Sequence, residues 1–155
     1  MSITFVSGDL LLTRAQVLAF GYNASGRTET GALEMALLNR YPAAFATYGK
    51  YCRAGRIKTG TMWLWRETKP ALGFMVVRET AVGATRLRYV EAVAMTLARD
   101  YKLDNIRSVA MALPGSPLEA PSLKEILTHW LDKSSLPVVV YEHYIPNVQA
   151  EEHFE

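Results

Sequence analysis

The chain has 155 residues, half of them hydrophobic, which suits a single globular domain with a sizeable core. Its formal net charge is only +2 at pH 7 and its basic residues are dispersed, which argues against binding nucleic acid or anionic membranes through bulk charge. The single cysteine, Cys52, excludes an internal disulfide bond, and its helical spacing with Phe45 and Tyr48 favours a buried structural thiol over a nucleophile.

The first two predicted elements are strands. Ile3–Val6 is a short β-rich run, and the N-terminal segment around it lacks the basic and apolar regions of a signal peptide. Val17–Phe20 is apolar throughout, which is typical of a strand buried on both faces of a sheet. A polar, glycine-bearing loop, Gly21–Thr28, follows it. No apolar run in the chain approaches the roughly 20 residues that cross a bilayer, so we expect a cytoplasmic protein without membrane contact.

Two helices and two strands are predicted next. Glu29–Arg40 carries leucine and alanine at helical spacing. Pro42 ends this helix and opens the next one, which is expected to end near Gly55. The strands are Thr61–Trp65 and Gly73–Val77, joined by a short polar turn. The two tryptophans of the first strand are expected to pack in the core and not to form a base-stacking platform.

The second half of the chain alternates helices with strands. Thr85 is the predicted cap of a long helix, and Ile106–Met111 is the next strand. Ser122–Glu125 has the spacing of a capping box for a further helix, and Pro137–Tyr144 is the last strand. Helices that separate apolar strands cover both faces of a sheet, so the order of elements predicts an α/β fold, a three-layer α/β/α sandwich.

Ligands of such open sheets bind beyond the C-terminal ends of the strands, which here are followed by Gly21–Thr28, Arg78–Ala84 and Leu113–Pro121. The first of these loops runs into a helix N-terminus near Gly31, whose free N–H groups suit an anion. Gly115–Ser116 in the third loop would let the backbone approach a diphosphate closely. The loops therefore indicate a phosphate-bearing ligand. No metal site is predicted, because the three histidines lack metal-ligand spacing: His129, His143 and His153.

Several spacings agree with one known family. Gly8–Leu10 precedes an apolar strand, and Asn23 then precedes a glycine-bearing loop and a helix. The stretch from Arg40 to Trp65 and the segment Arg78–Leu87 keep the lengths seen in that family. In these features the chain, as far as Tyr144, resembles macro domains, and most closely the branch that contains the DarG antitoxin and the terminal ADP-ribose glycohydrolase.

The resemblance implies a mixed, mostly parallel sheet with a pocket for ADP-ribose, either free or attached to protein or nucleic acid. It implies one macro domain over residues 1–145, followed by a polar C-terminal tail, residues 146–155, that we expect to fray. It implies no cofactor. Nucleic acid is expected as a partner only where it carries ADP-ribose, and the residues identify no toxin partner.

The family's binding residues carry over position by position. The resemblance implies that Asp9 accepts a hydrogen bond from the adenine amino group, with a turn or cap role after Gly8 as the alternative, and that the Leu10 N–H touches the same ring. Asn23 falls near the distal ribose, with closure of its own loop as the alternative. The diphosphate is expected beside two backbone segments: Gly31, Ala32 and Leu33 at the helix start, and Leu113, Pro114, Gly115, Ser116, Pro117 and Leu118 in the second phosphate loop.

The sequence also departs from the family pattern. Arg78 stands where this branch has a nucleophilic lysine, and a guanidinium keeps its proton near neutral pH, so it cannot be that nucleophile. It can still pair with a phosphate or a carboxylate. Glu119 is the nearest match to an aspartate at the end of the second phosphate loop and is the candidate general base, with a solvated loop charge as the alternative. Pro114 and Pro117 each remove one N–H donor from that loop.

Three functions follow from these residues: an ADP-ribose reader, a hydrolase that uses Glu119 and a ligand-activated water, and a scaffold that has lost its pocket. Arg78 and the proline-bearing loop favour the reader and the scaffold over the hydrolase. Asp9 and the preserved loop lengths favour the reader over the scaffold. We therefore expect an ADP-ribose-binding module.

Overall fold

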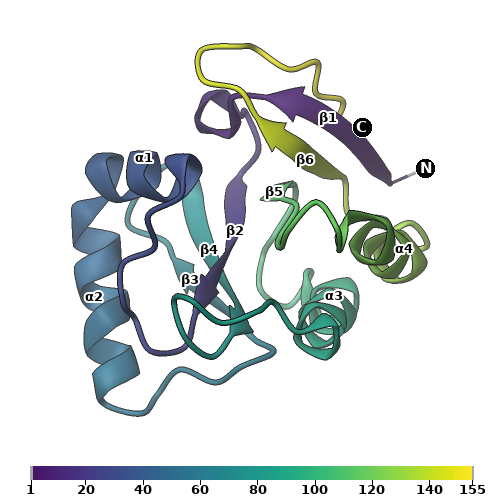
Figure 1. Ribbon diagram of the computed structural model, residues 1–155. Helices are drawn as coiled ribbons and strands as arrows, with labels where there is room; N and C mark the ends of the chain where they lie inside the picture. The colour runs from purple at the N-terminus through teal and green to yellow at the C-terminus, as the bar shows by residue number, and fades with distance from the viewer. Residues whose placement is uncertain (1, 155) are drawn as a thin grey trace.

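A computed structural model describes residues 2–154, which form one six-stranded sheet with α1 and α2 on one face and α3 and α4 on the other (Figure 1). The strand order is β1-β6-β5-β2-β4-β3, and every neighbouring pair is parallel except β3 with β4. The predicted three-layer α/β/α sandwich with a mixed, mostly parallel sheet is confirmed. In chain order the elements are β1 (Ile3–Gly8), the 3-10 helix η1 (Leu10–Leu12), β2 (Val17–Asn23), α1 (Ala32–Arg40), α2 (Pro42–Arg53), β3 (Met62–Trp65), β4 (Ala71–Arg78), α3 (Leu87–Asp100), β5 (Val109–Ala112), α4 (Ala120–Leu131) and β6 (Val138–Tyr144).

Strand β2 shows why both faces of the sheet are covered. All its residues are buried, and successive side chains point to opposite faces. Val17 and Ala19 belong to the cluster that includes α3 and α4, whereas Leu18 and Phe20 belong to the cluster that includes α1 and α2. A strand with two buried faces needs an apolar run, and this is the pattern that predicted the strand.

Aromatic rings fill the core between the sheet and the helix pair α1 and α2. The Phe74 ring lies 4.3 to 5.4 Å, between centroids, from four others: Phe20, Phe45, Tyr48 and Trp63. The predicted core role of Trp63 is thereby confirmed. Cys52 is half-buried on the same side, and burial raises the pKa of its thiol, which fits a structural role.

Two boundaries around the first loop differ from the prediction. Strand β2 continues to Asn23, because its backbone pairs with β4 as far as Arg78. Helix α1 begins at Ala32 and not at Glu29. Glu29 is held in the loop, since its N–H donates to the Tyr22 hydroxyl over 3.1 Å and its carboxylate binds Arg78. The loop therefore lies later in the chain and is more tightly fixed than its polar composition suggested.

Helix α3 also starts later than predicted. It begins at Leu87, with Arg86 in the cap position, because the Thr85 side chain is used elsewhere. The Thr85 hydroxyl accepts a hydrogen bond from Arg78 over 3.2 Å, and Thr85 is buried. Thr85 thus serves the end of β4 and not the helix.

The boundaries of β5 and α4 shift as well. Strand β5 begins at Val109 and not at Ile106, since the residues just before it bond to Gln16: the Gln16 N–H donates to the Ser108 hydroxyl over 2.8 Å. Helix α4 begins at Ala120, so the capping box predicted at Ser122–Glu125 lies inside the helix and caps nothing. The first error arises because a long-range contact overrides the local signal, whereas the start of α4 is set by local bonds such as that from the Ser116 N–H to the Glu119 carboxylate.

The segment 145–154 packs against the domain, so the expected fraying is wrong for these residues. The Val148 carbonyl accepts a hydrogen bond from the Asp9 N–H over 2.7 Å. The Glu152 side chain is buried, and its carboxylate accepts three hydrogen bonds: from the Thr13 hydroxyl at 2.5 Å, the Arg14 N–H at 3.0 Å and the Tyr141 hydroxyl at 2.6 Å. Three donors offset the cost of burying this charge.

Candidate functional site

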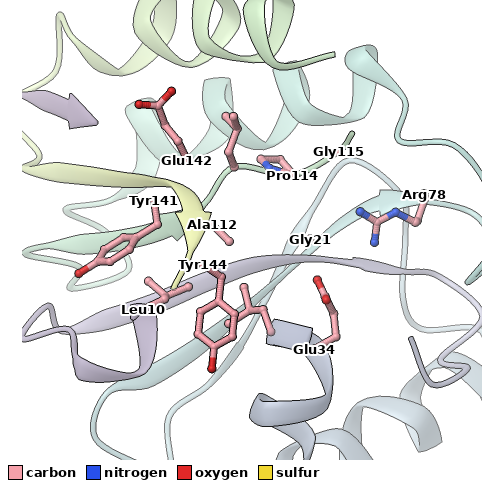
Figure 2. Close-up of a pocket in the computed structure, with 12 residues that line it drawn as sticks. Leu10, Gly21, Glu34, Arg78, Ala112, Pro114, Gly115, Tyr141, Glu142 and Tyr144 are labelled. Carbon is pink, nitrogen blue, oxygen red and sulfur yellow. The ribbon is translucent and has the colours of Figure 1, made fainter. Parts of the chain in front are cut away.

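A cavity of about 180 Å³ lies at the C-terminal edge of the parallel strands, where ligands of open α/β sheets bind (Figure 2). The ends of β2, β4, β5 and β6, the 3-10 helix and the start of α1 all reach it. Its lining consists of Leu10, Gly21, Leu33, Glu34, Arg78, Ala112, Leu113, Pro114, Gly115, Tyr141, Glu142 and Tyr144. Of the residues expected at the site, the cavity brings together Leu10, Leu33, Arg78 and Leu113–Gly115.

The end of the cavity next to η1 contains the segment expected to hold adenine. Leu10 is fully buried and lines the cavity, whereas Asp9, which directly precedes it, is buried behind it and is not among the lining residues. The Asp9 carboxylate accepts the Leu11 N–H over 2.9 Å and the Asn147 N–H over 2.8 Å. Asp9 therefore caps η1, as the alternative expectation had it, and it also holds the C-terminal segment in place, which the sequence did not predict.

Tyr144, at the end of β6, is a lining residue that sequence reasoning missed. Figure 2 shows its ring beside Leu10 at this end of the cavity. Burial, and secondarily the nearby charge of Asp9, raises the pKa of the Tyr144 hydroxyl, so the ring is neutral at physiological pH. Tyr144 lies at the C-terminal end of a strand, where a ligand is expected, but the sequence alone did not show that β6 reaches the cavity.

Only the first half of the predicted second phosphate loop lines the cavity. Leu113, Pro114 and Gly115 do so, with Gly115 at a φ of +119° that favours glycine. The rest of the loop is exposed: Ser116, Pro117 and Leu118. The Ser116 N–H donates to the Glu119 carboxylate over 2.8 Å and the Leu113 N–H donates to the Tyr141 carbonyl over 3.0 Å. Within residues 113–118, this leaves the N–H groups of Gly115 and Leu118 without a partner in residues 2–154.

Glu119 lies outside the cavity lining. It occupies the cap position of α4, and its carboxylate closes the loop through the Ser116 N–H. A Cβ atom on Gly115 would lie 2.9 Å from the Glu119 Oε1 atom, so glycine is also needed to let this carboxylate fold under the loop. The observed role of Glu119 is to shape the loop.

The N-terminus of α1 already has a carboxylate beside it. Gly31 is the cap residue, and neither it nor Ala32 lines the cavity, whereas Leu33 and Glu34 do. The Glu34 side chain folds back over the helix start, since a Cβ atom on Gly31 would lie 2.1 Å from its Oε1 atom. A carboxylate in this place interacts favourably with the helix dipole and occupies the position where a phosphate would bind.

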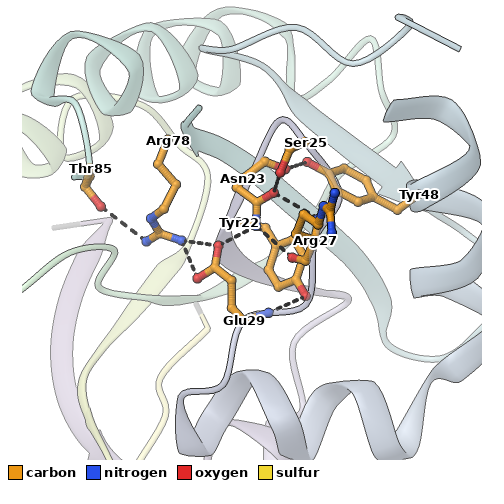
Figure 3. Close-up of polar contacts among 8 residues, drawn as sticks. All are labelled: Tyr22, Asn23, Ser25, Arg27, Glu29, Tyr48, Arg78 and Thr85. Atoms are coloured by element: carbon orange, nitrogen blue, oxygen red, sulfur yellow. Dashed lines mark hydrogen bonds and ion pairs between the residues drawn. The ribbon is translucent and has the colours of Figure 1, made fainter. Parts of the chain in front are cut away.

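Arg78 is held by a buried network at the end of β4 (Figure 3). Its Nη1 atom donates to both carboxylate oxygens of Glu29 over 2.8 Å, and its Nη2 atom donates to the Thr85 hydroxyl over 3.2 Å. The side chains of Arg78 and Glu29 are each only 11% exposed. The guanidinium at the family's lysine position is thus already paired with a carboxylate of this chain.

Asn23 closes its own loop, as the alternative expectation had it. Its side chain is fully buried. The Nδ2 atom donates to the Arg27 carbonyl and to the Glu29 carboxylate, both over 2.9 Å, and the Oδ1 atom accepts from the Ser25 hydroxyl and the Arg27 N–H. Two donors and two acceptors are the full capacity of this amide, so no capacity is left for a ribose hydroxyl.

The charged groups that line the cavity are one arginine and two glutamates, and two of these three are paired inside the protein. Arg78 pairs with Glu29, and Glu142 pairs with Lys124. Glu34 makes no ion pair within residues 2–154. In the same part of the chain no group of three or more histidine, cysteine, aspartate or glutamate side chains could hold a metal ion, and no helix is long and apolar enough to cross a membrane.

A scan against protein-family models finds no match to this sequence, and a search of curated proteins finds none either. Solved structures do match. The macrodomain of DarG from Thermus aquaticus superposes with a TM-score of 0.80 at 22% identity, over 90% of this chain and 97% of that one. The macrodomain of Mycobacterium tuberculosis DarG gives 0.79 at 25% identity, over 94% and 98%. Thermosipho africanus DarTG in complex with ADP-ribose gives 0.84 at 18% identity, over 96% of this chain and 43% of that one. The chain therefore has the macrodomain fold.

Proposed function

We propose that this chain binds ADP-ribose in the cavity at the C-terminal edge of its sheet. The observation that carries the proposal is that one cavity joins the two segments expected to hold the two ends of that ligand. Leu10 lies at one end of the lining, and Leu113–Gly115 form part of the rest. The matched Thermosipho africanus protein, whose fold this chain shares, is in complex with ADP-ribose.

The adenine end has donors and acceptors to spare. A carboxylate can accept about four hydrogen bonds, and Asp9 accepts two from backbone N–H groups, so it can still accept one from the adenine amino group. The Tyr144 ring and the Leu10 side chain supply apolar contact for the base. These three residues form the proposed adenine site.

The diphosphate end is less well equipped. The Gly115 N–H is the donor of the second phosphate loop that faces the cavity without an internal partner in residues 2–154. Arg78 can add a charged donor, although Glu29 shares its charge. The cavity is also smaller than the about 300 Å³ at the lower end of the usual range for ligand pockets, so Glu34 has to swing away from the helix start when a diphosphate enters.

A reader fits these residues better than a hydrolase. The Arg78 guanidinium stays protonated and is fixed by Glu29, so it supplies no nucleophile. The Glu119 carboxylate, the general base of the alternative reading, is engaged by the Ser116 N–H and does not line the cavity. We therefore propose binding without hydrolysis. The cytoplasmic location expected from the sequence stays a prediction.

Calorimetric titration with ADP-ribose tests the proposal. We expect a dissociation constant between about 1 μM and 1 mM, and weaker binding of AMP, which lacks the second phosphate and the distal ribose. Ligand at a hundredfold excess over the dissociation constant stabilises the folded chain by about 2.7 kcal/mol, so thermal unfolding gives an independent readout. If millimolar ADP-ribose gave neither a binding heat nor a shift in thermal unfolding, the scaffold would be the remaining function.

A further inference from the structure

A second depression lies at the opposite, N-terminal edge of the sheet. It has a volume of about 680 Å³ and is formed by the segment before β2, the turn between β3 and β4, and the segment before β5. We call it the basic groove. Its lining residues with charged side chains are Arg14, Arg66, Lys69 and Arg107, and no carboxylate is among the lining residues.

The four cations of the basic groove are exposed and unpaired. None of them forms an ion pair within residues 2–154, although Arg78, Arg99 and Lys124 elsewhere in the chain each do so. The whole chain carries a net charge of only +2, so the chain outside the groove is net negative. The fold therefore brings together in one depression four cations that are dispersed in the sequence, with no carboxylate among the lining residues.

The floor of the basic groove is held by hydrogen bonds between side chains and the backbone of neighbouring segments. The Gln16 side chain donates to the Asn105 carbonyl over 2.9 Å and accepts the Arg107 N–H over 2.5 Å. Arg66 donates through Nη2 to the Asp104 carbonyl over 2.6 Å. These bonds join the three segments. The backbone that carries the four cations is therefore held in place by the fold.

We propose that the basic groove binds the phosphodiester backbone of a nucleic-acid strand. Several exposed cations spread along one depression suit a ligand with several phosphates in a row, and they contact it without reading its sequence. No aromatic side chain is among the lining residues, so bases are not stacked there and the binding is sequence-independent.

Other anionic partners fit the basic groove less well. A membrane presents a broad flat surface, whereas this site is hollow, and no exposed large apolar side chain lines it for insertion between lipids. A specific phosphopeptide or free-phosphate site is expected to hold its anion on a buried charged donor, and all four cations here are exposed. ADP-ribose is not required at this groove, because the cavity lies at the other edge of the sheet.

The test is fluorescence anisotropy of a labelled, unmodified oligothymidylate titrated with the full chain at several salt concentrations. With up to four phosphates neutralised, log affinity should fall with log salt at a slope of about −2.8, or roughly 50-fold between 50 and 200 mM. The variant R14A/R107A removes two side chains that make no internal hydrogen bond in residues 2–154, and we expect a slope of about −1.4 and affinity lowered about tenfold or more at 50 mM.

The matched control is K50A/R53A, which removes the same charge from exposed positions on α2 and should leave affinity within about twofold. Unchanged ADP-ribose binding by R14A/R107A would show that this variant is folded. Three results would overturn the proposal: no binding of the strand by wild type at 50 mM salt, equal losses in both variants, or binding of phosphatidylserine vesicles without binding of the strand.

Discussion

The cavity and the basic groove lie at opposite edges of one sheet, and they handle charge in opposite ways. In the cavity, Arg78 is buried and its charge is shared with Glu29. In the groove, cations such as Arg14 and Arg107 are exposed and unpaired within the described chain. Paired, buried charges fix geometry for one small ligand, whereas exposed, unpaired charges attract any polyanion and are screened by salt. The same sheet thus carries a proposed specific site at one edge and a proposed non-specific site at the other.

The largest difference between the two edges should appear in stability. Glu29→Ala leaves the buried guanidinium of Arg78 without its partner, and the free energy of unfolding should fall by about 3–5 kcal/mol. Arg14→Ala in the basic groove should change it by no more than about 0.5 kcal/mol. Urea denaturation of both variants measures the contrast. Equal effects would mean that the ion pair in the cavity is not buried in solution.

A control separates the loss of the ion pair from the loss of an unpaired charge. The double variant E29L/R78M replaces the buried pair with apolar side chains, and such replacements often cost little. We expect it to be more stable than Glu29→Ala alone. Both variants lose the Asn23 bond to Glu29, so a double variant that is the less stable of the two would show that the cost of Glu29→Ala does not come from leaving the Arg78 guanidinium unpaired.

The next effect concerns Asp9, which holds the C-terminal segment and is proposed to bind adenine. Asp9→Ala should weaken ADP-ribose binding by about 1–3 kcal/mol, the range for a lost hydrogen bond to a charged group. Stability should also fall by about 1–3 kcal/mol, because the N–H groups of Leu11 and Asn147 lose their acceptor. Calorimetry measures the affinity for ADP-ribose, and urea denaturation measures the free energy of unfolding. Unchanged affinity in the folded variant would remove Asp9 from the adenine site.

The smallest expected effect is a rise in affinity for ADP-ribose. Glu34→Ala removes the carboxylate that covers the start of α1, so the repulsion of a diphosphate disappears and ADP-ribose affinity should rise about three- to tenfold. Glu125→Ala removes an exposed carboxylate of α4 and should leave affinity unchanged. A loss of affinity in Glu34→Ala would show instead that this carboxylate contacts the ligand favourably.

The sequence predicted the layers well, because the apolar run of β2 and the helical spacing of the flanking segments are local signals. Element ends were harder, since Glu29 and Thr85 are used by Arg78 and not by the helices that follow them. A contact across 49 positions of the chain leaves no mark on local periodicity.

The same limit applies to the sites. Leu113–Gly115 could be predicted because they follow a strand of a parallel sheet, but the Glu34 carboxylate over the helix start could not, since that depends on a side-chain rotamer. The cations of the basic groove are dispersed along the chain, and the fold alone brings them together. Low net charge therefore did not exclude a local basic site.

Amide NMR spectra of the labelled chain, recorded during titration with ADP-ribose, test the central claim most directly. We predict that the largest changes in chemical shift fall on the amides of residues around the cavity, such as Leu10, Gly115 and Tyr144. The amide signals of Arg14–Gln16 and Arg107 at the opposite edge should not shift. A spectrum that does not change at millimolar ADP-ribose, or shifts confined to the basic groove, would contradict the account.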